Sequence, residues 1–214
     1  MISFDRREAL RYMGYHGTEP DAAVAESLER CAAELQAAVQ PKSISARFPL
    51  SFTGENTMQI GDLTVTSANL ARNLRGCTEV YLMAATLGIG ADRLIARASA
   101  VRMSDAVILQ AVAAAMIETC CDEGNDALRR TAEQEGLYCR PRFSPGYGDF
   151  SIEHQRDFSR LLDTPRKIGL TVTESCLLAP IKSVTADIGL SPEKQDCHRK
   201  GCEECGKTDC NFRR

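Results

Sequence analysis

The 214-residue chain has little histidine, and what it has is poorly placed for catalysis. Its 3 histidines are His16, His154 and His198, and none lies near a serine or a cysteine in a recognisable nucleophile motif. His154 is interpreted as a helix-face or supporting residue, because the sequence shows no acidic partner for it at a useful spacing. Hydrolytic catalysis therefore has little support, and we assign no catalytic residue.

The chain also lacks the signatures of nucleic-acid, nucleotide and membrane proteins. Its net charge of −3 comes without the clustered basic face that nucleic acid requires. The glycine-rich turn at residues 86–90 has neither the glycine spacing of a dinucleotide fingerprint nor the Lys-Ser/Thr pair of a P-loop, so we interpret it as a plain turn. The N-terminus has no apolar signal core, and the most apolar run, residues 107–117, is interrupted by Gln110 and is too short to cross a bilayer. We expect a cytoplasmic protein that binds neither nucleic acid nor membrane.

The overall composition is that of an ordinary globular protein. Hydrophobic residues make up 43% of the chain and charged residues 26%. A chain of this length can bury a substantial core, and it fits one large domain with a small appendage. The composition changes at about residue 191, where a polar, cysteine-rich segment begins. We therefore divide the chain into a domain at residues 1–190 and a tail at residues 191–214.

Hydrophobic periodicity predicts both helices and strands in the domain. Helical spacing is found at residues 5–15, 20–39, 67–74, 91–100 and 104–133, and in a helix that follows Ser151 and is expected to end at Pro165. Strand patterns are found at residues 44–52, 58–60, 63–65, 79–85, 168–172 and 182–188. The turn at Gly61 and Asp62 suits a hairpin. Together they indicate an α+β fold with a mixed, largely antiparallel, twisted sheet flanked by helices.

Residues 140–149, Arg-Pro-Arg-Phe-Ser-Pro-Gly-Tyr-Gly-Asp, stand out between two helical patterns. The segment is too rich in proline and glycine for a helix or strand interior, because proline lacks the N–H and glycine raises the entropy cost of ordering. An isolated Pro-Gly pair usually only turns the chain. The other side chains of this segment make a binding loop the more specific interpretation.

Each of the residues between Arg142 and Tyr147 offers a ligand something different. Pro145 favours an extended Ser144, which would leave the backbone N–H and C=O of Ser144 free for a ligand. Gly146 would let a ligand approach the main chain closely, and Arg142 offers a fork for a carboxylate. Tyr147 adds a ring with a polar tip.

One carboxylate in the long helical segment at residues 104–133 also needs a partner. Glu118 directly follows Ile117 and lies within the apolar part of the segment. A carboxylate in such surroundings is costly unless it is paired or binds a ligand. Glu118 is therefore a candidate binding residue.

The tail contains a candidate metal site. Cys197, Cys202, Cys205 and Cys210 lie in a short hydrophilic segment, with His198 as a substitute ligand. Such a segment has almost no apolar side chains, so a metal is the plausible source of its order. Four thiolates suit either tetrahedral Zn²⁺ or an iron–sulfur cluster, and the tail without metal would be disordered or redox-active. The remaining cysteines are interpreted as buried hydrophobes, and Cys139 is the one that borders the loop at residues 140–149: Cys31, Cys77, Cys120, Cys121, Cys139 and Cys176.

Three motifs in order along the chain resemble one family. Residues 142–147 read Arg-Phe-Ser-Pro-Gly-Tyr, residues 168–175 read Ile-Gly-Leu-Thr-Val-Thr-Glu-Ser, and residues 179–186 read Ala-Pro-Ile-Lys-Ser-Val-Thr-Ala. They resemble the activation domain of cobalamin-dependent methionine synthase in its stand-alone form. The resemblance extends over residues 48–189, and the end of the tail, Cys-Asn-Phe-Arg at residues 210–213, is similar to that of stand-alone members.

The resemblance implies a C-shaped α+β domain that binds S-adenosylmethionine. In this family the domain supports reductive methylation of inactive cob(II)alamin on a corrinoid protein, such as the methionine synthase core. Because the chain lacks an Asp-x-His-x-x-Gly corrinoid motif, the cobalamin is expected on a partner. A flavodoxin or a ferredoxin would be the electron donor.

The resemblance also implies which residues hold S-adenosylmethionine. Arg142, the main chain at Ser144, Gly146 and Tyr147 would line the site. The family places an acidic residue of the preceding long helix on the ligand, and Glu118 is the candidate. A shift of one turn would put Ala114 or Asp122 there instead.

Another class of function is left open by the sequence. A non-catalytic adaptor or electron-transfer protein for a corrinoid methyltransferase would use a zinc or iron–sulfur tail and would need no small ligand. Affinity for S-adenosylmethionine distinguishes the two functions.

Overall fold

The structure is a computed structural model that describes residues 2–194, so the proposed tail ligands lie outside the described residues. The helices are α1 (Arg6–Tyr12), α2 (Ala22–Ala38), α3 (Ala68–Asn73), α4 (Ile89–Val101), α5 (Met103–Gln134), α6 (Gln155–Leu162), which follows a 3₁₀ turn at Ile152–His154, and α7 (Thr164–Ile168). The strands are β1 (Lys42–Phe52), β2 (Thr57–Ile60), β3 (Leu63–Thr66), β4 (Glu79–Thr86), β5 (Tyr138–Cys139), β6 (Thr171–Val172), β7 (Leu178–Ala179) and β8 (Ser183–Ser191). The predicted α+β class is confirmed.

The strands of the main sheet lie in the order β3-β2-β1-β4-β8-β5, and β6 pairs separately with β7. Strand β1 is long enough to pair with β4 through residues 42–49 and with β2 through residues 50–52. The predicted hairpin is confirmed, because Ile60 of β2 lies opposite Leu63 of β3. The sequence predicts a mixed and largely antiparallel sheet, and every pair that the structure describes is antiparallel.

Strand β4 lies at the centre of the sheet and is buried on both faces. Successive side chains of a strand point to opposite faces, so a strand covered on both sides is a continuous apolar run. Val80, Leu82 and Ala84 pack into one core, and Tyr81, Met83 and Ala85 pack into the other. The sheet is therefore the middle layer between two helical layers.

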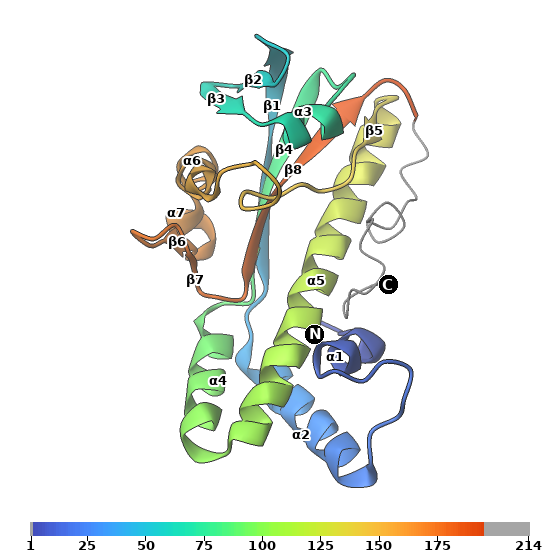
Figure 1. The fold of residues 1–214 in the computed structure, drawn as a ribbon, viewed down its shortest axis with the longest axis vertical. Coiled ribbons are helices and arrows are strands. Elements are labelled where there is room, and N and C mark those ends of the chain that lie inside the picture. Colours follow the sequence, from blue (N-terminus) through green and yellow to red (C-terminus); the bar gives the residue numbers. More distant parts are fainter. Residues whose placement is uncertain (1, 195–214) are drawn as a thin grey trace.

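One helical layer consists of α1, α2, α4 and α5, with α5 crossing the sheet along most of the height of the molecule (Figure 1). Its small residues, among them Ala111, Ala113 and Ala115, are buried. Within residues 2–194, α5 is the one helix that is long and apolar enough to cross a membrane by length and composition alone. Of its apolar window, 61% is buried inside the protein, as in the core helix of a globular domain.

The glycine-rich turn before α4 exists because α4 approaches α2 closely. Gly88 precedes the helix with φ 81°, a conformation that favours glycine. A Cβ atom at Gly90 would lie 1.9 Å from the carbonyl oxygen of Ala38. The spacing of these two glycines is thus explained by backbone packing between the end of α2 and the start of α4.

The other helical layer consists of α3, α6 and α7, and it corrects two details of the sequence prediction. Asp163 adopts a left-handed conformation (φ 53°) after α6, and Pro165 then lies in the first turn of the new helix α7. Proline fits a first turn because its missing N–H would have no partner there. Ile168 consequently ends a helix and does not begin a strand, and only Thr171–Val172 of the predicted strand forms β6. In the first helical layer, Pro20 lies outside α2 and not in its first turn as predicted, because Asp21 caps the helix and α2 begins at Ala22.

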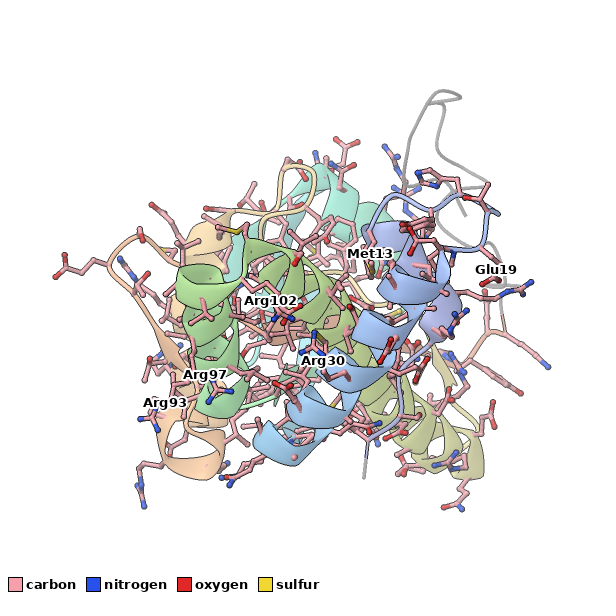
Figure 2. The ribbon with its side chains drawn as sticks, turned by 90° about the horizontal axis from the view of Figure 1, so that it is seen from below. Met13, Glu19, Arg30, Arg93, Arg97 and Arg102 are labelled. Atoms are coloured by element: carbon pink, nitrogen blue, oxygen red, sulfur yellow. The ribbon has the colours of Figure 1, made fainter. Side chains whose placement is uncertain are left out.

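Arginines gather at one end of the first helical layer, although the chain as a whole is acidic. Figure 2 shows Arg30 of α2, Arg97 of α4 and Arg102, the single residue between α4 and α5. Arg30 donates to Asp105 of α5 at 2.9 Å and pairs with Glu34 at 3.3 Å. Exposed ion pairs of this kind contribute up to about 1 kcal/mol each, so the layer depends mainly on its apolar contacts.

Two glycine-to-alanine substitutions test the close approach of α2 and α4. Gly90→Ala should lower the free energy of unfolding by about 1–3 kcal/mol, because the added methyl group meets the backbone of α2. Gly124→Ala in α5 is the control, since its Cβ would meet only the end of Met83 at 3.6 Å and alanine favours a helix by up to about 1 kcal/mol. Urea unfolding measures both variants. A Gly90→Ala protein as stable as the parent would contradict the described packing.

Candidate functional site

A cavity of about 340 Å³ lies at the free edge of β8, between α5 on one side and α6 with β7 on the other. Its size falls within the range of small-molecule sites. The wall consists of Glu118 from α5, Arg142 to Pro145 and Tyr147 from the loop, Gln155 from α6, Leu178 from β7, and Ser183, Val184 and Thr185 from β8.

The edge of β8 is free because its outer neighbours are short. Strand β5 pairs only with Leu190 and Ser191. Further back along β8, Phe143 and Asp187 exchange two main-chain hydrogen bonds of 3.0 and 2.8 Å, which attach the loop to the strand at a single residue. Between this bridge and the start of β8, no described strand pairs with the outer edge, and the cavity occupies that place.

The predicted binding loop turns sharply at Ser144 to Tyr147. The N–H of Tyr147 donates to the carbonyl of Ser144 at 3.2 Å, and Gly146 has φ 96°. Proline and glycine at the two central positions are typical of a type II turn. The carbonyl of Ser144 is therefore engaged, contrary to the prediction, whereas its N–H has no partner among residues 2–194.

Gly146 is not among the residues of the cavity wall, and the expected close approach of a ligand at this residue stays a prediction. Its own N–H donates to the carbonyl of Phe150 at 2.8 Å, and its positive φ is what the turn requires. Tyr147 lies on the rim, with 68% of its surface exposed. Gly146 thus shapes the loop, and Tyr147 is open to both the cavity and the solvent.

Arg142 lies between two carboxylates of α5. Its Nη2 donates to Glu118 at 3.2 Å and to Asp122 at 2.8 Å. Its Nη1 is buried and has no hydrogen-bond partner in the described part of the chain. Of the three registers that the sequence leaves open, Glu118 is on the cavity wall, while Asp122 contacts Arg142 from one turn further along and Ala114 is absent from the wall.

Asp149 fastens the far end of the loop to α3. Its carboxylate accepts from the hydroxyl of Ser67 and from the backbone N–H groups of Ala68 and Asn69, at 2.5, 2.7 and 3.0 Å. The bond from Ser67, followed by the backbone bonds, lowers the pKa of Asp149 to about 2. The predicted cap at Ser67 is confirmed, since its oxygen accepts from the N–H of Leu70, but the sequence gives no sign that Asp149 joins it.

Two residues near the loop lie outside the cavity wall. The Nδ1 of His154 lies 2.9 Å from Asp157, so the acidic partner judged absent from the sequence is present one helical turn away. The ring of His154 packs on Phe150, with 5.2 Å between centroids, which agrees with a supporting role. Cys139 does not reach the cavity, and burial raises the pKa of its thiol to about 11.

Within residues 2–194 the cysteines are all unbridged, and those other than Cys139 are buried. The prediction that they serve as apolar residues agrees with this burial. No group of three or more His, Cys, Asp or Glu side chains within that range is arranged to hold a metal ion. The metal prediction for Cys197, Cys202, Cys205 and Cys210 concerns residues outside the described part and stays a prediction.

Sequence reasoning missed the wall that faces Arg142. Gln155 and Thr185 are both buried, and the hydroxyl of Thr185 donates to Oε1 of Gln155 at 2.5 Å. Gln155 belongs to no recognisable motif. Thr185 lies in a predicted strand, but its alternation with Val184 and Ala186 would place it on a polar face, so the sequence gives no signal that it is buried.

Comparison with models of protein families gave no match, and comparison with curated protein sequences gave none. Among solved structures, the chain is similar to the crystal structure of the MetH reactivation domain bound to AdoHcy. The match has a TM-score of 0.64 and 16% sequence identity, and it covers 88% of this chain and 76% of that chain. The chain therefore has the fold of that domain.

Removing the carboxylate of Asp149 should change the acid stability of the protein. Its folded pKa of about 2 lies below the ordinary value of 3.8, so its stabilising effect is complete above pH 3.8 and is lost as the pH falls through 2. Asp149→Ala should lower the unfolding temperature at pH 7 and should flatten the loss of stability between pH 4 and pH 2. Thermal unfolding across this range measures both effects. Asp126→Ala, which removes an exposed carboxylate paired with Arg129, controls for charge, and an unchanged acid slope in Asp149→Ala would refute the assignment.

Proposed function

We propose that the cavity binds S-adenosylmethionine and that the protein supports reductive methylation of a cobalamin carried by a partner, such as the methionine synthase core. The buried Nη1 of Arg142, which has no partner among residues 2–194, is the observation that carries this proposal. A buried donor without a partner costs free energy, and a charged one costs more. Arg142 is on the cavity wall, and a small rotation of its guanidinium would bring this nitrogen to a ligand carboxylate, which would satisfy it with a charge-assisted hydrogen bond.

The charges around Arg142 suit the rest of the ligand. One guanidinium and the two carboxylates of Glu118 and Asp122 leave one negative charge in the cluster. S-adenosylmethionine carries an ammonium, a sulfonium and a carboxylate, and so has one net positive charge. Glu118 lies on the cavity wall and could accept from the ammonium while Arg142 binds the carboxylate. The similarity in fold to a domain that was solved with AdoHcy supports the same ligand class.

The open rim suits transfer to a partner protein. Tyr147 is largely exposed at the rim, and the face of its ring attracts a cation such as a sulfonium. The chain would bind and orient the methyl donor and leave the methyl group accessible from outside. When bound, S-adenosylmethionine supplies the methyl group, and the partner's cobalamin with an external one-electron donor, a flavodoxin or a ferredoxin, supplies the acceptor. We place this reaction in the cytoplasm.

The cysteine tail adds a separate proposal. Cys197, Cys202, Cys205 and Cys210 would bind one Zn²⁺ or one iron–sulfur cluster, with His198 as a substitute ligand for zinc. With a cluster, the tail could pass electrons to the partner, which is the alternative function that the sequence suggests. The tail and the cavity are tested independently.

Arg142→Ala tests the cavity. Calorimetry should show that the parent protein binds S-adenosylmethionine and that the variant binds it about 10–100-fold more weakly, because a charge-assisted contact is lost. Arg129→Ala, which removes an exposed arginine of α5 that pairs with Asp126, should bind as the parent does. Equal affinity in the parent and Arg142→Ala, or no binding by the parent, would overturn the proposal.

Metal analysis of anaerobically purified protein tests the tail. The parent should contain either zinc or iron with sulfide, and Cys205→Ser should lose most of it, since a tetrahedral site needs all its ligands. A colour that bleaches on reduction identifies a cluster, and colourless protein with zinc identifies the other site. Cys120→Ser, which alters a buried cysteine of α5, should retain the metal. Metal-free parent protein would end this proposal.

A further inference from the structure

We propose that Gln155 determines ligand specificity by donating a hydrogen bond from its amide to the nucleoside half of the ligand, with Thr185 as the residue that positions it. The inference rests on the proposed function of the cavity. It gives a role to the cavity wall that contains Gln155 and Thr185. The chemistry of this wall differs from that of the loop.

Gln155 is held in one orientation. It is the first residue of α6 and is 6% exposed, and Thr185 of β8 is 2% exposed. The hydroxyl of Thr185 donates to Oε1 of Gln155 at 2.5 Å. In this arrangement the amide oxygen accepts from Thr185, and the NH₂ group is directed elsewhere.

The NH₂ group of Gln155 has no partner among residues 2–194, although the side chain is almost completely buried. What remains of its exposure lies on the cavity wall. The nitrogen itself is not among the fully buried side-chain atoms that lack a partner, so it is open at the cavity wall and available as a donor. A ligand acceptor in the cavity would supply the missing partner.

The main chain beside Gln155 adds a donor and an acceptor. In β8, Asp187 exchanges hydrogen bonds with Phe143, and the carbonyl of Gly189 accepts from the N–H of Arg140 at 2.8 Å. Main-chain groups of alternate residues point to the same edge of an antiparallel strand. Those of Thr185 therefore point to the free edge, where the described chain has no strand to pair with them. The polar groups on this wall can bind a flat heterocycle or a ribose edge-on.

The distribution of charge sets the orientation of the ligand. Charged groups, those of Arg142 and Glu118, are found on the side of α5. The side of α6 and β7 offers Gln155, Thr185 and Leu178, which are uncharged. A zwitterionic amino-acid moiety belongs with the first group, and an uncharged nucleoside belongs with the second. S-adenosylmethionine would thus lie with its nucleoside against Gln155.

Two ligands distinguish the contacts made at one end of the cavity from those made at the other end. S-adenosylhomocysteine has both the amino-acid moiety and the nucleoside, whereas 5′-methylthioadenosine has the nucleoside alone. Calorimetry should show that Gln155→Leu weakens the binding of both ligands about tenfold, because one hydrogen bond to a buried partner is lost. Arg142→Ala should weaken the binding of S-adenosylhomocysteine and leave that of 5′-methylthioadenosine unchanged.

Thr185→Val tests the positioning role. It removes the hydroxyl that holds the amide, and it should weaken both ligands about threefold to fivefold. Its effect should not add to that of Gln155→Leu, because both substitutions disturb the same contact. A purely structural role of Thr185 would instead lower the unfolding temperature and leave affinity unchanged. Gln155→Met, which keeps the volume without the donor, replaces Gln155→Leu if that variant fails to fold.

The outcomes distinguish the two proposals. If the parent binds neither ligand, the proposed function fails, and the assignment of Gln155 fails with it. If the parent binds both ligands and Gln155→Leu and Gln155→Met bind them as tightly, the role of Gln155 is overturned while the proposed function stands. Weakened binding of S-adenosylhomocysteine alone would place Gln155 at the amino-acid end and would overturn the proposed orientation.

Discussion

The pair of main-chain hydrogen bonds between Phe143 and Asp187 is the contact on which the site depends. It joins the loop to β8 at one residue, and the part of β8 before this residue has no neighbour on its outer edge among the described strands. A free edge normally invites pairing with another chain, and proteins cover or shorten such edges. Here the edge is short, and the loop, α5, α6 and β7 enclose it, so the unpaired groups face a cavity and not another strand. The polar main-chain groups on the cavity wall are therefore a consequence of the interruption in the sheet.

The loop is also held on either side of that bridge: before it, the N–H of Arg140 donates to the carbonyl of Gly189 at 2.8 Å, and two further contacts follow it. The type II turn at Ser144 to Tyr147 directs Tyr147 to the rim, and Asp149 binds the start of α3 through its carboxylate. Only hydrogen bonds to the ionised carboxylate explain a pKa of about 2, because Asp149 is exposed and burial would act in the opposite direction. The loop is therefore fixed at both ends and in the middle before any ligand binds. Such preorganisation lowers the cost of ordering on binding.

The parts predicted well from the sequence were those governed by local rules. The hairpin at Gly61 and the cap at Ser67 need only neighbouring residues, and the long helix α5 shows its period over 32 residues. The loop was recognised from its composition and motif, and the structure brings Arg142, Ser144 and Tyr147 to one cavity with Glu118. The predictions that failed concerned features that depend on contacts between distant parts of the chain. Pro165 is compatible both with the end of one helix and with the first turn of the next, so the sequence alone does not decide between them. The hydrogen bond between Gln155 and Thr185 joins residues that are 30 positions apart, on elements that share no motif.

Asp187 shows why an interrupted sheet carries a cost in this fold. Its main chain makes the bridge to Phe143, while its side chain is fully buried, and neither oxygen has a partner within residues 2–194. Burial raises the pKa of the carboxyl well above its usual range, so the group is neutral where an ordinary aspartate is ionised. Because the folded pKa lies above the unfolded one, stability from this residue is complete below pH 3.8 and falls as the pH rises towards the folded value. Asp149 acts in the opposite sense on the same loop, losing its effect in acid. The two carboxyl groups thus change the stability of the bridge in opposite senses as the pH rises, Asp149 by losing its proton more easily than in the unfolded chain and Asp187 by losing it less easily.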